Sequence, residues 1–380
     1  MTVLWKALTA LILSAMTLSA QGVQGWAKRL EGRGIAVSAG LWDAATGKVL
    51  ERHHEDLALI PASTTKALTT YALLKTLKPD FTVETEVWGD LKDGVVWGDL
   101  VFKGDGDPLL TSERIWMLAQ ALKKQGVQRV TGSVRLDQSA FDDQREPQGW
   151  ENTSLNTLPP VLPLSVNFNR DEDGHLVADP ERQSREIIRR ILTETGIACE
   201  GRSGVSGTPR SLLVWSSPPL RSLIVDINKW SNNFMIEMLV RKYGAGSWPR
   251  GVKRIQEFYR TAFDLGPEAV HITDGSGLSK DNRLSARTLA IILRGAYHDF
   301  EVGPEYVASL KIIGGEPWKL KTKDANLTRR VRVKTGHLDG VTSLCGYLQT
   351  LDGQVRVFAI LLNGPADDDD VWEQVSRWAN

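Results

Sequence analysis

The sequence predicts an α+β protein in which an antiparallel sheet packs with helices and an inserted, mostly β accessory domain interrupts the main domain. Three observations favour this fold. A strand pair and a helix follow the N-terminal segment, residues 82–210 change to short strands and turns, and helices followed by three strands and a last helix complete the chain. The 380 residues are 42% hydrophobic, which is enough for two domains or for one large domain with an insertion.

The first part of the main domain is predicted at residues 26–81. Two strand-like runs, residues 35–41 and 48–53, flank a turn that contains Gly47, as in a β-hairpin. Residues 64–77 are rich in Ala and Leu and lack Gly and Pro, so they predict a helix with Ser63 at its N-terminal edge.

The inserted domain is predicted at residues 82–210. Its strand-like runs, residues 82–88, 95–102 and 130–136, alternate with turn clusters, and a helix is expected near residues 111–124. The change from helical to short-strand texture indicates a separate module.

The second part of the main domain is predicted at residues 211–380. Helical texture is expected at residues 219–243, three strands at residues 330–335, 343–351 and 354–362, and a final helix at residues 367–378. The acidic residues before the last helix complement its dipole, so they indicate a helix start and not a metal site.

The N-terminus has the pattern of a secretory signal peptide, predicted at residues 1–25. Lys6 precedes an apolar run at residues 7–20, which is shorter than the roughly 20 apolar residues of a spanning helix. An uncleaved anchor is the alternative. The 46 basic residues balance the 46 acidic ones, so net charge favours neither nucleic acid nor an anionic membrane as a partner. An exported protein without a stable membrane span is expected.

Cysteine and histidine usage predicts no metal centre and no cofactor. Cys199 and Cys345 are too few for a zinc site, and Cys345 lies in an apolar run that favours a small buried side chain; a disulfide between the two is the alternative. The six histidines show no metal-ligand spacing, and His53 and His54 are interpreted as a strand end.

Ser63 and Lys66 are the candidate nucleophile and base. They stand three residues apart at the start of a predicted helix, so their side chains share one helix face. A serine hydroxyl needs a neighbouring base, and lysine serves only when its charged form is disfavoured. At a helix start the backbone N–H of Ser63 is also available to an oxyanion.

Two further motifs follow in the chain. Ser231-Asn232-Asn233 has the S-x-N pattern, which also occurs twice elsewhere and alone indicates only a polar helix face. Lys334-Thr335-Gly336 ends a strand-like run and is the only K-T-G of the sequence. S-x-x-K, S-x-N and K-T-G in this order are the signature of penicillin-binding proteins and class A β-lactamases.

The chain resembles the D-alanyl-D-alanine carboxypeptidase/endopeptidase family of low-molecular-weight class C penicillin-binding proteins, peptidase family S13. The resemblance implies a serine β-lactamase/transpeptidase-like main domain. The matching segments span most of the chain: PASTTK (61–66), GDLVFKGDGDP (98–108), GSVRLDQSAF (132–141), SPPL (217–220), KWSNNFMIE (229–237), DGSGLS (274–279) and KTG (334–336).

The resemblance implies roles for the motif residues. Ser63 would attack the carbonyl between two D-alanines, Lys66 would act as base, and Ser231 would pass a proton to the leaving amine. Asn233 would bind the substrate amide, and Lys334 would add positive potential. Substrate binding would involve Thr335, Gly336 and the backbone N–H of His337.

The resemblance also implies peptidoglycan peptides and β-lactams as partners, in the periplasm or cell-wall space. Asp137 lies in a segment that faces the cleft in the family, where it would bind the amino group of the stem peptide's diamino acid. A turn at a strand end explains Asp137 equally well. His337 departs from the small hydroxyl residue usual after K-T-G, and the preference between carboxypeptidase and endopeptidase action stays open, as does the oligomeric state.

Two other functions fit the same motifs. A class A β-lactamase needs a glutamate in an E-x-x-L-N pattern, and residues 151–156 (ENTSLN) are one residue out of register. A catalytically silent protein that binds β-lactams or the cell wall would keep the motifs as a pocket. Turnover of penicillin distinguishes the first alternative, and release of D-alanine distinguishes the second.

Overall fold

The computed structural model describes residues 22–150, 159–202, 208–315 and 324–380. Contacts divide the chain into two compact units. Unit 1 comprises the chain up to Ala72, Asn228–Ser231 and Gln256–Asn380, and unit 2 comprises Leu73–Ile227 and Asn232–Ile255. Unit 2 contains and exceeds the expected insertion, whose boundaries stay a prediction.

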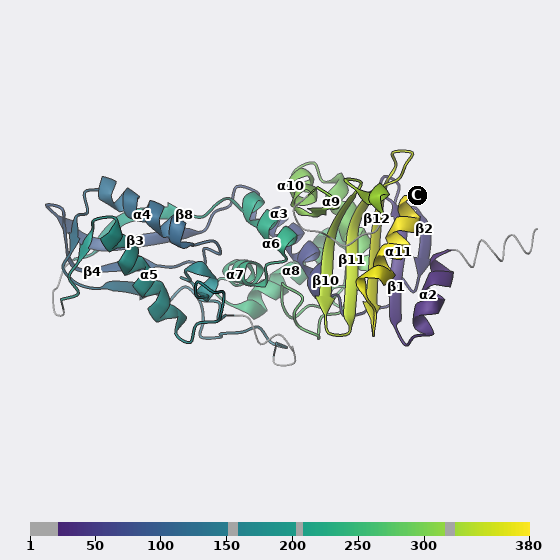
Figure 1. Cartoon of the computed structure of the whole chain (residues 1–380), viewed down its shortest axis with the longest axis horizontal. Coiled ribbons are helices and arrows are strands. Elements are labelled where there is room, and N and C mark those ends of the chain that lie inside the picture. The colour runs from purple at the N-terminus through teal and green to yellow at the C-terminus, as the bar shows by residue number, and fades with distance from the viewer. Residues whose placement is uncertain (1–21, 151–158, 203–207, 316–323) are drawn as a thin grey trace, which may run out of the picture. The chain divides into compact units, whose positions relative to one another are not determined.

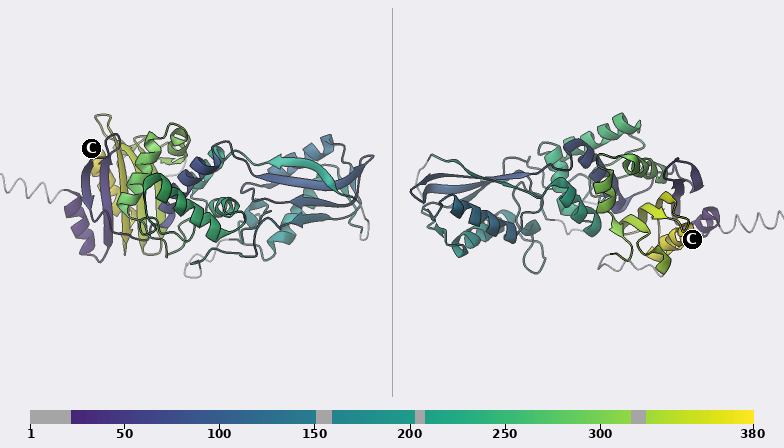
Figure 2. Two further views of the ribbon diagram at one scale, coloured as in Figure 1. Left: turned by 180° about the vertical axis from the view of Figure 1, so that it is seen from behind. Right: turned by 90° about the horizontal axis from the view of Figure 1, so that it is seen from above.

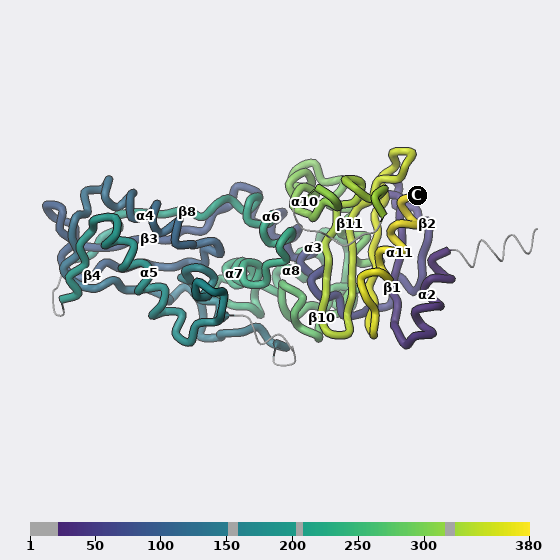
Figure 3. Tube along the Cα trace, viewed as in Figure 1, coloured from purple at the N-terminus to yellow at the C-terminus, as the bar shows by residue number. Residues whose placement is uncertain are grey.

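Unit 1 is built on a six-stranded antiparallel sheet of order β2-β1-β12-β11-β10-β9 (Figure 1). The N-terminal strand β1 pairs with β12 from the end of the chain, with Ala36 opposite Asn363, so the tube in Figure 3 shows purple and yellow segments side by side. The strands are β1 (Ala36–Asp43), β2 (Val49–His53), β9 (Lys311–Ile312), β10 (Val331–Leu338), β11 (Val341–Gln349) and β12 (Val355–Asn363). The predicted hairpin and the predicted antiparallel sheet are confirmed.

Helices cover both faces of this sheet. α2 (Val23–Glu31) and α11 (Asp368–Ala379) share a hydrophobic core with the face that carries Val37, and Trp26 and Trp372 are buried there. Successive strand residues face opposite sides. Ser38 therefore faces the other side, where its hydroxyl accepts from the backbone N–H of Ala286, the first residue of α9 (Ala286–His298). The view from behind in Figure 2 shows green helices on this face.

The acidic residues near the C-terminus begin α11, as predicted. Asp367 accepts from the N–H of Asp370, and the Asp370 carboxylate accepts from the N–H of Asp367, which forms a capping box. Two of the helix's orphan donors are thereby satisfied.

Unit 2 contains a second sheet of order β7-β5-β4-β3-β8, with β6 also paired to β4. The helices α4 (Ser112–Lys124) and α5 (Pro180–Glu194) pack on it through a core that includes Phe102 and Leu192. The strands are β3 (Glu84–Lys92), β4 (Val95–Lys103), β5 (Arg129–Val130), β6 (Val134–Asp137), β7 (Ala198–Cys199) and β8 (Arg210–Ser216). The α+β fold with an additional β domain is confirmed.

The helical structure expected in residues 219–243 is confirmed, and it is divided into two helices. The structure has α6 (Leu220–Trp230) and α7 (Asn233–Tyr243), separated at Ser231, where φ is +58°. Non-glycine residues rarely adopt this left-handed conformation. The Asn232 side chain accepts from the N–H of Met235 and begins the second helix. Further helices are α3 (Thr65–Leu77), α8 (Trp248–Phe263) and α10 (Gly303–Ser309).

Most of the predicted signal peptide lies outside the described residues, but α2 begins at Val23, within its expected last residues. None of the helices in the described ranges is long and apolar enough to cross a membrane. Cys345 is buried in β11, as expected, and the suggested disulfide is wrong because both cysteines are free.

The burial of Asp107 in unit 2 predicts that the stability of the folded protein depends on pH. Its side chain is 2% exposed and Oδ1 accepts from the N–H of Leu109, while Oδ2 has no partner among the described residues. Burial raises the pKa of Asp107 to about 6. The folded protein therefore binds a proton that the unfolded chain releases near pH 4, and stability is lost as pH rises toward 6.

Asp107→Asn removes this charge. We expect its Tm to rise relative to wild type by about 5 °C between pH 4 and pH 7, since roughly 3 kcal/mol of charge burial disappears. Differential scanning calorimetry at several pH values measures the difference. A Tm difference that does not change with pH contradicts this prediction.

Candidate active site

Ser63 lies in a short 3₁₀ turn, Ala62–Thr64, that leads directly into α3 (Thr65–Leu77). The preceding Ala62 has φ of +48°, a strained conformation for a residue with a Cβ atom. The turn is held by the Pro61 carbonyl, which accepts from the Ser343 hydroxyl of β11 at 2.6 Å. The fold thus fixes the direction of the Ser63 side chain.

Lys66 lies on the next turn and contacts the serine, as the spacing predicted. Its Nζ donates to Ser63 Oγ at 2.9 Å, and the lysine side chain is fully buried. Burial disfavours the charged form of a lysine. A hydroxyl and an amine of this kind form a nucleophile–base pair.

A loop after α8 supplies a second acceptor to Lys66. Nζ donates to the backbone carbonyl of Ser276 at 2.7 Å, and the Thr69 hydroxyl donates to the neighbouring Gly275 carbonyl at 2.9 Å. Gly277 has φ of +82°, and a Cβ atom there would lie 1.9 Å from the Ala62 carbonyl oxygen. Only glycine allows this loop to pack against the turn that carries Ser63.

Asp274 holds the loop in shape. Its buried carboxylate accepts from the N–H groups of Gly277 at 2.9 Å and Ser279 at 2.8 Å, and from Asn282 Nδ2 at 2.6 Å. The resemblance marked this loop through the DGSGLS segment (274–279), but the sequence contained no signal that a backbone carbonyl of the loop reaches Lys66.

Asp274→Asn tests this positioning. The amide places an NH₂ group against N–H donors, so the loop should shift and move the Ser276 carbonyl away from Lys66. We expect the rate of acylation by penicillin to fall about ten- to a hundredfold, because small displacements of reacting groups are costly. Stopped-flow measurement of acylation gives the rate.

Asp43→Asn is the matched control for stability. Asp43 also holds a turn of unit 1, by accepting from the N–H and hydroxyl of Thr46, but it does not contact the loop. An equal loss of acylation in both variants would mean that Asp274 acts only through general stability.

Ser231 and Lys334 form the second contact of the site. Lys334 Nζ donates to Ser231 Oγ at 2.9 Å and to the Thr335 carbonyl at 2.7 Å. Burial lowers the pKa of Lys334 well below its ordinary value, and the nearby charges of Lys66 and Lys311 lower it further. The strained backbone at Ser231 directs its hydroxyl to this lysine from the break between α6 and α7.

Strand β10 passes directly beside the nucleophile turn. A Cβ atom on Gly336 would lie 2.9 Å from the backbone nitrogen of Ser63 and 2.3 Å from Ser343 Oγ, so glycine is required for this approach. Thr335 is partly exposed and His337 is exposed on the same strand, and His337 Nδ1 lies 4.0 Å from an Asp368 carboxylate oxygen.

Two predicted site residues belong to unit 2. Asn233 is the first residue of α7, and Asp137 ends β6. Asp137 Oδ1 accepts from the N–H of Ser139 at 2.9 Å, and hydrogen bonds to Ser139 hold the pKa of Asp137 below its ordinary value. This strand-end turn gives Asp137 a structural role that requires no bound ligand.

Unit 1 therefore brings together Ser63, Lys66, Ser231, Lys334 and Gly336 from distant parts of the chain. Sequence reasoning missed Thr69 and Ser343, whose hydroxyls bond only backbone carbonyls near the pair. Neither belongs to a motif, although DGSGLS marked the loop that Thr69 contacts.

The chain is similar to known proteins in sequence and in fold. Carboxypeptidase Rv3627c of Mycobacterium tuberculosis (strain ATCC 25618 / H37Rv) is 28% identical over 361 residues, which cover 84% of this chain and 75% of that protein. The D-alanyl-D-alanine carboxypeptidase of Actinomadura sp. (strain R39) is 25% identical over 415 residues, covering 85% and 76%. The crystal structure of penicillin binding protein 4 from Haemophilus influenzae shares the fold, with a TM-score of 0.77 at 18% identity, over 93% of this chain and 98% of that one.

These similarities and the Ser–Lys geometry define a serine-type carboxypeptidase, which is a hydrolase. The sequence profile of the D-Ala-D-Ala carboxypeptidase 3 (S13) family matches residues 26–174 and 163–380. The chain belongs to this family, and the resemblance seen in its motifs is confirmed.

Proposed function

We propose that the protein is an exported D-alanyl-D-alanine carboxypeptidase, DD-endopeptidase or both, which acts on peptidoglycan stem peptides through an acyl-enzyme on Ser63. The observation that carries the proposal is the hydrogen bond between Lys66 Nζ and Ser63 Oγ, 2.9 Å long, made by a fully buried lysine. The family and the order of the three motifs support the substrate class.

In the proposed acylation, Ser63 Oγ attacks the carbonyl carbon between two D-alanines while its proton passes to Lys66. The tetrahedral intermediate places negative charge on the carbonyl oxygen, for which the backbone N–H groups of Ser63 and His337 are the proposed donors. The C–N bond then breaks and the leaving nitrogen takes a proton through Ser231. Water hydrolyses the resulting ester and releases the shortened peptide.

The other motif residues have proposed binding roles. Lys334 supplies a buried nitrogen next to Ser231, and burial lowers its pKa well below the ordinary value. Thr335 and Gly336 would hold the terminal D-alanine, with Gly336 allowing the peptide to lie along the strand. Asn233 would bind the substrate amide, and Asp137 would bind the diamino acid.

The β-lactam ring presents the same kind of acyl group, so penicillin should form a stable ester with Ser63. Export to the periplasm or cell-wall space is proposed from the pattern of residues 1–25 and from the location of the substrate. Residues 151–156, which are out of register with the β-lactamase pattern, lie outside the described residues.

The experiment has two arms. Incubation with fluorescent penicillin, followed by proteolysis and mass spectrometry, should place one label on the Ser63 peptide. Assays with a D-Ala-D-Ala pentapeptide and with a cross-linked muropeptide dimer then measure free D-alanine and cross-link cleavage. Rapid turnover of penicillin would indicate a β-lactamase, and equal D-alanine release by wild type and Ser63→Ala would overturn the proposal.

A further inference from the structure

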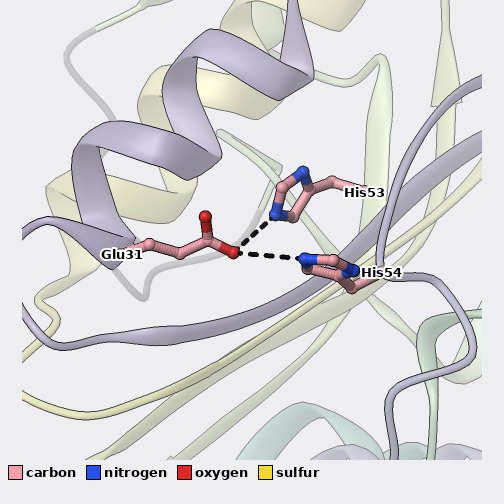
Figure 4. A group of neighbouring side chains, drawn as sticks. All are labelled: Glu31, His53 and His54. Atoms are coloured by element: carbon pink, nitrogen blue, oxygen red, sulfur yellow. Dashed lines mark hydrogen bonds and ion pairs between the residues drawn. The ribbon is translucent and has the colours of Figure 1, made fainter.

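Three potential metal ligands meet where α2 lies beside the end of β2 (Figure 4). The side chains of Glu31, His53 and His54 point toward one another, and their ligand atoms all lie within 4.8 Å. One Glu31 oxygen, Oε1, lies 2.7 Å from His53 Nε2 and 3.5 Å from His54 Nε2. A single carboxylate oxygen is thus shared by two imidazoles.

The backbone brings the two histidines to the same side. Neighbouring residues of a strand normally point to opposite faces. His54 has φ of +41°, which interrupts the extended strand conformation and turns the His54 ring toward the His53 ring. The centroids of the two rings lie 4.2 Å apart. Such a conformation carries strain in a residue other than glycine, and strained residues of this kind concentrate at functional sites.

The buried histidine, His53, contacts the side-chain amide of Gln24 through its second ring nitrogen. Gln24 Nε2 donates to the Arg52 carbonyl at 2.7 Å, which leaves Gln24 Oε1 facing His53 Nδ1 at 3.2 Å. The other nitrogen, Nε2, faces Glu31, and metal-bound histidines are oriented by a partner on the second nitrogen in the same way.

We propose that Glu31, His53 and His54 form a binding site for a divalent transition-metal ion of the Zn²⁺ class. Two imidazole nitrogens and one carboxylate oxygen suit zinc, with a water as the fourth ligand. Zinc bonds of about 2.0–2.1 Å in a tetrahedron separate neighbouring ligand atoms by about 3.3 Å. Glu31 Oε1 lies 2.7 Å from His53 Nε2 and 3.5 Å from His54 Nε2, so small side-chain movements bring these two separations to this value.

The site joins α2 to the edge strand of the sheet and takes no part in acyl transfer. α2 is already fixed to β2 by the Val23 N–H, which donates to a Glu51 carboxylate at 2.8 Å. β2 and β10 are separated by β1, β12 and β11, so at about 4.8 Å per strand the two strands lie roughly 19 Å apart. Bound zinc would therefore stabilise unit 1 without being required by Ser63.

Isothermal titration with ZnCl₂ tests the site, using protein that carries no polyhistidine tag and has been dialysed after EDTA treatment. We expect one Zn²⁺ per chain in wild type and at least about tenfold weaker binding in His54→Gly, which keeps the positive φ without strain. Gln24→Ala should also weaken binding, since it removes the partner of His53. His175→Ala is the control, because His175 is exposed and forms an ion pair with Asp171 alone among the residues that the structure describes.

Thermal unfolding gives an independent readout. Zinc should raise the Tm of wild type and of His175→Ala in a concentration-dependent manner, but not that of His54→Gly. Absence of zinc binding by wild type, or the same affinity in His54→Gly, would overturn the proposal whether or not the protein cleaves D-alanyl-D-alanine.

Discussion

Replacement of Ser63 by alanine is expected to abolish covalent labelling by penicillin and to lower D-alanine release by on the order of 10⁴-fold or more. The substitution removes the only atom placed to form the ester, Oγ, which receives the 2.9 Å hydrogen bond from Lys66. When nucleophile and base act as one unit, loss of either removes nearly all of the covalent chemistry. Gel fluorescence and a D-alanine assay measure the two effects.

Thr64→Ser is the matched control for Ser63→Ala. Thr64 lies in the same turn, and its hydroxyl donates to the Pro61 carbonyl at 2.6 Å, a bond that serine retains. Penicillin should label the Thr64→Ser variant at close to the wild-type rate. Stoichiometric labelling of Ser63→Ala at another residue would show that the nucleophile has been misassigned.

The sequence predicted the elements that carry the site better than it predicted how they meet. The helix after Ser63, the strand that contains Lys334 and the antiparallel sheet were expected from composition and periodicity, and they are present. The pairing of β1 with β12 brings together residues about three hundred positions apart, and no local pattern specifies such a partner.

Backbone conformation explains what local patterns missed. Residues 219–243 have helical texture, but no local pattern marks Ser231 as the residue whose left-handed φ separates two helices and directs its hydroxyl to Lys334. A similar conformation at His54 places two neighbouring histidines on one side, although strand geometry predicts opposite faces. Both residues violate local propensity, as expected where a fold is built around a site.

The contacts made by backbone carbonyl groups could not be predicted from the sequence either. Ser276 acts on Lys66 through its main-chain oxygen, which every residue possesses, so the sequence offers no side-chain signal for it. Gly277, which allows the contact, can be read from the sequence, but the reason why glycine is required at this position cannot. Only the fold shows that a Cβ atom there would collide with the Ala62 carbonyl.

Lys66→Ala should lower acylation by penicillin about 10²- to 10⁴-fold, the usual contribution of a general base. The substitution leaves the Ser63 hydroxyl without a proton acceptor at 2.9 Å. Lys334 is bonded to Ser231 and not to Ser63, so it should not replace the missing amine. Stopped-flow acylation rates across pH 5–10 measure the effect.

Lys75→Ala, near the end of the same helix, is the control for a lysine-to-alanine change in this helix and should acylate like wild type. The double variant Ser63→Ala/Lys66→Ala should be no less active than Ser63→Ala alone, because a base without its nucleophile has nothing to activate. A Lys66→Ala protein that acylates at the wild-type rate would mean that another group takes the Ser63 proton. The short contact between the two side chains would then be only structural.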